Sequence, residues 1–203
     1  MINPIKISCF LFLFTICSSK SFGQIEQGTF IIDPYIGVPG ERLLTKFNFA
    51  FEDYTYTGWP MSLGIRGEYM FTDYIGVGID ANYSNYGYEY IIEGAYYNGV
   101  TQTFHDAHYE FQGNTFRFML RANYHLIRTS NLDAYIGGGV GGRDINTKTL
   151  VDGKQTSSTN LYIPVAFRLA VGGHFYFTEN IGIHAEAGIS GGGFVQGGLA
   201  IKF

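Results

Sequence analysis

Cysteine is nearly absent from this chain of 203 residues, and its only two examples, Cys9 and Cys17, lie close to the N-terminus. The remaining sequence can therefore form no disulfide, and it offers no thiolate for metal binding or nucleophilic catalysis. No later segment approaches the roughly 18 consecutive apolar residues that a transmembrane helix needs. Basic residues are outnumbered, 13 against 17 acidic ones, so nucleic acid is not an expected partner.

The N-terminus itself has the three parts of a secretory signal peptide. Lys6 provides a positive start, residues 7–17 form an apolar run, and residues 18–23 are polar with small residues at both cleavage-determining positions. We expect cleavage after residue 23, which leaves residues 24–203 as one domain. An uncleaved membrane helix is disfavoured because the run is too short to cross about 30 Å of hydrocarbon. A lipoprotein site at Cys17 is disfavoured because the residue before it is bulky.

What the rest of the chain does contain is period-2 alternation of apolar with small or polar residues, which is typical of strands with two different faces. From Leu161 to Phe177 the odd positions are apolar almost throughout, whereas the even positions are small or polar with Arg168 in the middle. The pattern recurs in other segments, more weakly where glycine or proline interrupts it. The eight expected strands are residues 29–38, 61–71, 75–84, 116–126, 132–143, 161–177, 181–190 and 195–203.

The connections between these segments alternate in length. Three are tight turns around residues 73, 129 and 179, and the glycine turn at 191–193 is also short. Short turns on one rim and mostly long loops on the other are typical of outer-membrane barrels. We therefore predict an all-β protein, a closed antiparallel transmembrane β-barrel of eight strands with both termini on the short-turn, periplasmic side. The long polar loops expected on the extracellular side are residues 39–59, 85–112 and 144–160.

Alternation alone does not say which face points inward, and a soluble barrel of the lipocalin kind, apolar inside, is the rival interpretation. The charged residues favour the membrane barrel because they all share the face that carries glycine and alanine. On a lipid-facing surface a mid-membrane Arg would cost roughly 2–4 kcal/mol, whereas small residues beside long ones fit the narrow interior of an eight-stranded barrel. The expected lumen residues are Asp33, Arg66, Glu68, Asp80, Arg117, Arg121, Arg143, Arg168, His174, His184, Glu186 and Lys202.

The tight turns also predict a register for these lumen residues. The first turn places Arg66 opposite Asp80, and the third places His174 opposite His184. Because buried charges must be paired, we favour a salt-bridge network that plugs the lumen. The alternative is a narrow passive pore for small solutes, with a slight preference for anions.

The histidines raise a separate possibility of metal binding or acid–base chemistry. His174, His184 and Glu186 have suitable reach across neighbouring strands, and His105 and His108 are three residues apart in a predicted loop. Cross-strand histidines in a barrel are more often hydrogen-bonded lumen residues, and the loop spacing is too common to indicate a site. We therefore expect no cofactor.

Tyrosine crowds the first two predicted loops, and it is favoured in binding surfaces because it offers a large contact area at low entropic cost. These residues therefore predict an interaction surface for an extracellular ligand or protein. A compatible alternative is that the strands continue past the membrane as a hairpin stabilised by cross-strand aromatic pairs. The residues concerned are Tyr54, Tyr56, Trp59, Tyr86, Tyr88, Tyr90, Tyr96 and Tyr97.

With its signal peptide, its eight alternating segments and its last residues Leu199-x-Ile201-x-Phe203, the sequence resembles the small OmpA/OmpX-type family of outer-membrane β-barrels. It is particularly similar to the "porin family" barrel proteins of Bacteroidota. The resemblance is one of pattern and spans residues 24–203. It implies an integral location in a Gram-negative outer membrane, contact with lipid and lipopolysaccharide, and insertion by the barrel-assembly machinery with Leu199, Ile201 and Phe203 as an assembly signal.

The resemblance brings no catalytic signature with it. Lipid A deacylases of the small-barrel type carry a His-x-Ser pair, and none of the five histidines here has Ser or Thr two residues later. The palmitoyltransferase type of small barrel uses loop residues without such a motif, so a lipid-modifying enzyme is a further alternative. We expect a non-enzymatic protein with a structural or surface-interaction role.

Overall fold

The computed structural model describes residues 24–39, 54–57, 59, 61–98 and 103–203. The expected signal peptide and most of the first expected loop lie outside these residues. Within the described ranges, no helix has the length and hydropathy to cross a membrane. The strands found there are β1 (Phe30–Pro39), β2 (Tyr54–Thr57), β3 (Ser62–Met70), β4 (Ile75–Asn98), β5 (Thr103–Arg128), β6 (Leu132–Val151), β7 (Lys154–Tyr176), β8 (Ile181–Ile189) and β9 (Gly193–Lys202).

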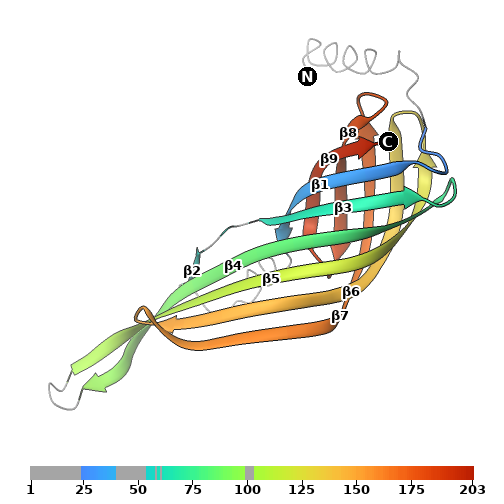
Figure 1. Cartoon of the computed structure of the whole chain (residues 1–203). Coiled ribbons are helices and arrows are strands. Elements are labelled where there is room, and N and C mark those ends of the chain that lie inside the picture. The colour runs from blue at the N-terminus through green and yellow to red at the C-terminus, as the bar shows by residue number, and fades with distance from the viewer. Residues whose placement is uncertain (1–23, 40–53, 58, 60, 99–102) are drawn as a thin grey trace, which may run out of the picture.

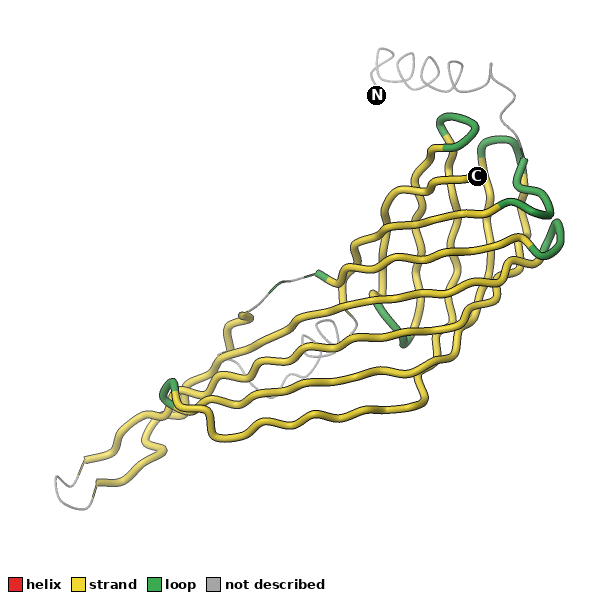
Figure 2. The backbone as a smooth tube through the Cα atoms, in the orientation of Figure 1, coloured by secondary structure: helices red, strands yellow, loops and turns green. Residues whose placement is uncertain are grey.

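Eight of these strands close into a ring, as the sequence predicts. Every pairing is antiparallel, and the order is β4-β3-β1-β9-β8-β7-β6-β5, with β4 and β5 paired to close the circle. The short β2 lies outside the ring, end to end with β3 along the same edge of β4. Figures 1 and 2 show the closed barrel and the long strands that leave it. The fold class, an all-β closed antiparallel barrel of eight strands, is thus confirmed.

Three short turns join the strands at one rim, and they share one local mechanism. In each turn a threonine Oγ1 accepts a hydrogen bond of 2.9–3.0 Å from the backbone N–H three residues later. The backbone N–H of the same threonine donates to the carbonyl of that later residue. Such side-chain bonds fix tight turns. The three pairs are Thr72 with Ile75, Thr129 with Leu132, and Thr178 with Ile181.

These turns set the register that the sequence predicts. Arg66 lies opposite Asp80 across β3 and β4, and His174 lies opposite His184 across β7 and β8. Both register predictions are confirmed. Because side chains alternate between faces along a strand, each of these pairs points into the barrel.

The interpretation of residues 85–112 and 144–160 as long loops is wrong. Four strands run far beyond the barrel rim, and β4 and β5 stay paired as far as Asn98 and Thr103. The β6–β7 hairpin ends in a tight turn at Asp152 and Gly153, which both have positive φ. Threonine and tyrosine favour strands even where hydropathy no longer alternates. We call β2 and residues 85–98, 103–112, 144–151 and 154–160 the protruding sheet; it is the tapering part of Figure 1.

Burial settles which face of the barrel points inward. Asp33, Arg66 and Glu186 are almost fully buried, whereas large apolar residues such as Leu120 and Val165 are 60% and 72% exposed. The apolar face is therefore the outer one, and the lipocalin-like alternative is wrong. A buried apolar cluster does exist, but it is small and lies near the short-turn rim. It consists of Ile25, Ile31, Met70, Tyr176 and Ala200.

Glycines on the inner face make room for large neighbours across the strands. Tyr35 faces Gly64 in the β1–β3 register, and a Cβ added to Gly64 would lie only 2.2 Å from the Tyr35 ring carbon Cζ. Tyr135 faces Gly172 in the same way, and there the added Cβ would lie 2.5 Å from the phenol oxygen. Small residues thus let bulky polar side chains cross a narrow lumen.

Candidate functional site in the barrel lumen

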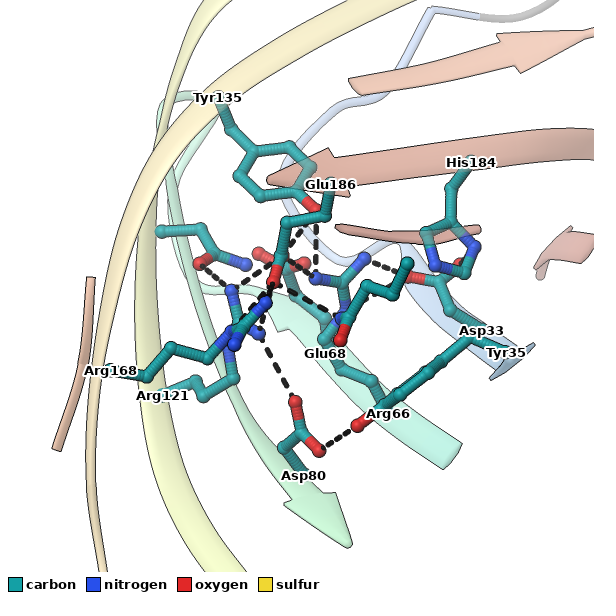
Figure 3. Close-up of polar contacts among 12 residues, drawn as sticks. Asp33, Tyr35, Arg66, Glu68, Asp80, Arg121, Tyr135, Arg168, His184 and Glu186 are labelled. Carbon is teal, nitrogen blue, oxygen red and sulfur yellow. Dashed lines mark hydrogen bonds and ion pairs between the residues drawn. The ribbon is translucent and has the colours of Figure 1, made fainter. Parts of the chain in front are cut away.

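The centre of the lumen is the carboxylate of Glu186 on β8, which gathers donors from several strands (Figure 3). Three guanidiniums reach it, from Arg66 on β3 at 2.5 Å, Arg121 on β5 at 2.8 Å and Arg168 on β7 at 2.8 Å. The phenol of Tyr135 donates to the same carboxylate at 2.7 Å. Charge-assisted hydrogen bonds of this length are stronger than those between neutral groups. This one carboxylate therefore connects β8 with β3, β5, β6 and β7 through the barrel interior.

Two further carboxylates complete what we call the arginine cluster, namely Arg66, Arg121, Arg168, Asp33, Asp80 and Glu186. Arg66 also forms an ion pair with Asp33 on β1, and Arg121 donates to Asp80 on β4 at 3.1 Å. Asp80 in turn accepts a hydrogen bond of 2.6 Å from the phenol of Tyr35. All of these charged side chains are almost completely buried. Paired in this way, they fill the middle of the lumen.

Arg168 extends the cluster to the rim opposite the short turns. Its guanidinium donates to the carbonyl of Ser190 at 2.9 Å and to that of Gly193 at 3.1 Å. The glycines at 191–193 are buried, and a Cβ added to Gly191 would lie 2.8 Å from the sulfur of Met119. The β8–β9 turn, expected only as a short connection, is therefore folded against the lumen contents at this end of the barrel.

At the short-turn end a second group of residues forms what we call the histidine chain. Glu68 contacts His125 Nε2 at 3.0 Å, and His125 Nδ1 contacts Asp133 at 2.7 Å. Asp133 then contacts His174 Nδ1 at 2.8 Å, and His174 Nε2 contacts Asp33 at 3.1 Å. Asp33 belongs to both groups, so the histidine chain and the arginine cluster form one continuous network.

The remaining lumen residues expected from the sequence lie beside this network. Arg117 donates to Asn82 and Ser84, each at 3.2 Å. Arg143 lies opposite Arg117 in the β5–β6 register, and among the described residues no hydrogen-bond partner reaches its Nε. The ammonium of Lys202 lies over a tyrosine ring, that of Tyr176, at 4.7 Å.

His184 differs from the other two lumen histidines. Its Nδ1 lies 3.1 Å from the carbonyl oxygen of Leu199, and among the described residues its Nε2 has no hydrogen-bond partner. Its distance to the nearest Asp33 oxygen is 3.9 Å. No group of three or more His, Cys, Asp or Glu in the described ranges is arranged to hold a metal ion.

The sequence analysis missed four members of the network, namely Tyr35, His125, Asp133 and Tyr135. All four lie on the inward-facing parity of their strands, and that parity could have identified them. Parity is the only signal for the two phenols, because tyrosine also occupies outward-facing positions such as Tyr69. Asp133 was overlooked because glycines weaken the alternation of its strand.

Outside the barrel, the predicted tyrosine surface forms a ladder of stacked rings on the protruding sheet. The rings of Tyr88 and Phe111 lie 4.9 Å apart, and those of Tyr90 and Tyr109 lie 5.2 Å apart and almost parallel. Tyr86 continues the ladder, with its ring 6.2 Å from that of Phe111. These rings share the face that lines the lumen lower down, because β4 and β5 pair without a register shift between the two regions. The alternative that the strands continue as a hairpin stabilised by cross-strand aromatic pairs is therefore confirmed.

For the other predicted tyrosines, the structure describes only the position of the backbone. Tyr54 and Tyr56 of β2 lie opposite Tyr90 and Tyr88, while Tyr96 and Tyr97 lie opposite His105 and Phe104. The side chains of these four tyrosines lie outside the described part of the structure. Trp59 is 57% exposed.

The C-terminal motif lies on the last strand of the ring. Leu199 and Phe203 are exposed on the outer face and Ile201 is partly exposed. The backbone of Phe203 exchanges two hydrogen bonds with that of Phe30, of 2.8 and 3.1 Å. This pairing joins the end of the chain to its first strand and closes the barrel there.

No family model matches the chain, and no curated protein matches its sequence. Among solved structures it is similar to the N-terminal β-barrel domain of OprF from Pseudomonas aeruginosa, at 17% identity and a TM-score of 0.48 over 88% of this chain and 99% of that one. It is also similar to the attachment invasion locus protein Ail of Yersinia pestis, at 13% identity and 0.41 over 87% and 99%. The outer membrane protein OprG of Pseudomonas aeruginosa gives 14% identity and 0.45 over 88% and 97%. Because these identities and TM-scores are low, the assignment of the fold rests on the strand pairing of this chain itself.

Proposed function

We propose that this chain is an integral outer-membrane protein with a non-enzymatic role. Its barrel spans the bilayer in contact with lipid and lipopolysaccharide, its lumen is plugged, and its protruding sheet presents a binding surface outside the cell. In this arrangement the barrel serves as the anchor, and the sheet and its aromatic ladder meet the extracellular ligand or protein.

The observation that carries this proposal is the inverted distribution of polarity. A barrel in water would hide its apolar face and expose its charges, but here charged side chains fill the inside and large apolar ones cover the outside. A continuous apolar surface of this kind matches the outward-facing band of barrels that lie in lipid. Every strand of the ring contributes to it: Ile36, Ile65, Val77, Leu120, Ile136, Val171, Ile183 and Leu199 are all exposed.

The orientation follows from the two rims. Barrels of this type keep short turns on the periplasmic side and longer elements outside. Both the C-terminus and the three short turns lie at one end in Figure 1, and the protruding sheet leaves from the other. We therefore place the C-terminus and the start of β1 in the periplasm.

Because residues 24–203 contain no cysteine, single-cysteine labelling of intact cells tests both the span and the orientation. Ser158→Cys lies in the protruding sheet and Glu179→Cys in a short turn; both positions are exposed. A maleimide that cannot cross the membrane should label Ser158→Cys in intact cells, and Glu179→Cys only after the membrane is opened. The reverse pattern would overturn the orientation, and labelling of both sites in intact cells would overturn the membrane span.

Conductance tests the plug separately. Residues 24–203, refolded and shown to be folded by heat-modifiable gel mobility, should give no steps, or only rare small ones, in planar bilayers. The arginine cluster and the buried β8–β9 turn support this expectation. Steady steps that change when Arg117 or Arg121 is replaced would instead establish the alternative of a narrow, anion-preferring pore.

A further inference from the structure

His125 and His174 are each held between two carboxylates, which is an unusual environment for a neutral imidazole. Both ring nitrogens of His125 lie within 3.0 Å of carboxylate oxygens, one from Glu68 and one from Asp133. Both ring nitrogens of His174 lie within 3.1 Å of carboxylate oxygens, one from Asp133 and one from Asp33. All four contacts are buried.

Hydrogen-bond chemistry decides which protonation state fits these contacts. A neutral imidazole has one N–H donor and one lone pair, whereas an imidazolium has two N–H donors. With a neutral ring, the lone pair of one nitrogen would face the lone pairs of an ionised carboxylate in a buried site. With two donors, each ring instead makes two charge-assisted hydrogen bonds.

The charge balance of the network leads to the same protonation state. Among the described residues, the contacts link five carboxylates with only three guanidiniums, those of Arg66, Arg121 and Arg168. Two imidazoliums would offset this excess of negative charge together with the ammonium of Lys202, which interacts electrostatically with Asp133. The five carboxylates are Asp33, Glu68, Asp80, Asp133 and Glu186.

The wider surroundings of His125 are consistent with a cation. From β3 it faces Glu68, and from β6 it faces Asp133 together with the ring of Tyr135, whose centroid is 5.6 Å away. The guanidinium of Arg66, on the same strand as Glu68, is itself paired with Asp33 and with a second carboxylate.

His174 has more neighbours. Asp33 of β1 and Asp133 of β6 contact its nitrogens, and the rings of Tyr135 and Tyr176 lie 5.4 and 5.9 Å from it. The ring of His184 on β8 lies 6.0 Å away. From β3 the paired Arg66 shares Asp33 with it, and from β9 the ammonium of Lys202 lies on the ring of Tyr176.

We infer that His125 and His174 are permanent imidazolium cations of the folded barrel, and that their two protons hold the short-turn end of the lumen network together. Removing both protons would take away the two positive charges that lie between Asp33, Glu68 and Asp133. Repulsion between these carboxylates would then loosen this end of the plug. The inference concerns the protonation of the lumen and holds whether or not the protruding sheet binds a ligand.

His184 supplies an internal comparison. Among the described residues its hydrogen-bond acceptor is the carbonyl of Leu199, and a neutral ring with a single N–H can donate to it. Two lumen histidines should therefore be charged and one neutral, although all three lie within the same barrel.

The direct test is nitrogen NMR of the refolded wild-type protein with labelled histidine, recorded at about pH 8, where free histidine is almost entirely neutral. We expect imidazolium signals from His125 and His174 and a neutral signal from His184. His125→Gln and His174→Gln should each remove one imidazolium signal, whereas His184→Gln should remove a neutral one. Neutral signals from all five histidines would mean that the two protons are bound to carboxyl groups or are absent. This result would overturn the inference.

A second measurement does not depend on the variants folding. If the folded barrel holds two protons that the unfolded chain releases above about pH 6.5, unfolding becomes easier as the pH rises. The folding equilibrium constant of the wild type should then fall by up to about tenfold per pH unit for each histidine. A urea midpoint that stays constant or rises from about pH 7 to about pH 9 would contradict the inference.

Discussion

The protruding sheet is built largely from four strands that also form half of the barrel, yet the inner faces of the two regions differ completely. Along β4 the inner positions of the barrel carry Asp80 and Asn82, both buried. Further along the same strand, in the protruding sheet, the inner positions carry Tyr86 and Tyr88. The rings of both residues contact the ring of Phe111 on β5. The backbone pairing is continuous across the boundary.

The difference shows that surroundings, and not backbone pairing, select the side chains of these strands. Where the ring is closed and the outside is apolar, polar groups must pair within the lumen. Where the sheet is open, an aromatic face becomes possible, and amides and charges such as Gln112, Glu110 and Lys148 occupy the opposite face. The barrel should therefore depend on single buried charges, and the protruding sheet on ring contacts.

The largest effect should follow from neutralising the central carboxylate of the lumen. Glu186→Gln would leave three guanidiniums without their shared partner, and breaking a buried ion pair costs about 3–5 kcal/mol. Urea unfolding, followed by heat-modifiable gel mobility, should show a loss of this size. Glu93→Gln, an exposed carboxylate of the protruding sheet, is the matched control and should change stability by less than about 0.5 kcal/mol. Equal losses in both variants would show that the barrel does not depend on single buried charges more than the protruding sheet does.

A smaller loss should come from filling space in the lumen. The Cβ of Gly64→Ala would clash with the ring of Tyr35 at 2.2 Å, and overpacking of this kind costs about 1–3 kcal/mol. Gly67→Ala lies on the same strand but faces outward, where the added Cβ would be 3.5 Å from a ring carbon of Phe30, an ordinary contact. Urea midpoints of the two variants should therefore separate. If Gly64→Ala matched the wild type, Tyr35 would not be fixed where the structure places it.

The same comparison explains how much the sequence could predict. The barrel strands were identifiable because lipid outside and charge inside impose strict alternation, and the tight turns fixed the pairing of Arg66 with Asp80. The protruding sheet resembles loops in the sequence because both of its faces contain polar residues, so hydropathy gives no period there. Tyrosine spacing in 86–90 was the one signal that remained, and it supported either interpretation.

Contacts across the lumen could not be predicted in the same way. Register gives only the partners on adjacent strands, whereas Arg66 of β3 reaches Glu186 of β8 through the barrel interior. Such a contact depends on side-chain length, on the barrel's diameter and on the glycines that leave room for it. The sequence therefore indicated which residues belong to the lumen but not that Glu186 is their centre.

Contacts between stacked aromatic rings should contribute to the stability of the protruding sheet and not to that of the barrel. Tyr88→Ala removes the ring that stacks on Phe111 at 4.9 Å, and an aromatic pair contributes about 0.5–1.5 kcal/mol beyond its buried area. We expect faster proteolysis within residues 85–112 of the refolded protein, with no change in the urea midpoint of the barrel. A shift of that midpoint as large as the one for Gly64→Ala would mean that the two regions unfold as one unit.

The smallest effect should come from a change at Glu89, which follows Tyr88 in the sequence and has its side chain on the other face of the protruding sheet. Glu89 and His108 form an ion pair of 3.5 Å, and both side chains are more than a third exposed. Exposed pairs of this kind contribute about 0–1 kcal/mol and are screened by salt. Glu89→Ala should therefore leave both the proteolysis rate and the urea midpoint within error of the wild type. Since Glu89 and Tyr88 are adjacent in sequence, a loss in Glu89→Ala equal to that in Tyr88→Ala would show that the backbone at this point, and not the ring ladder, determines the stability of the protruding sheet.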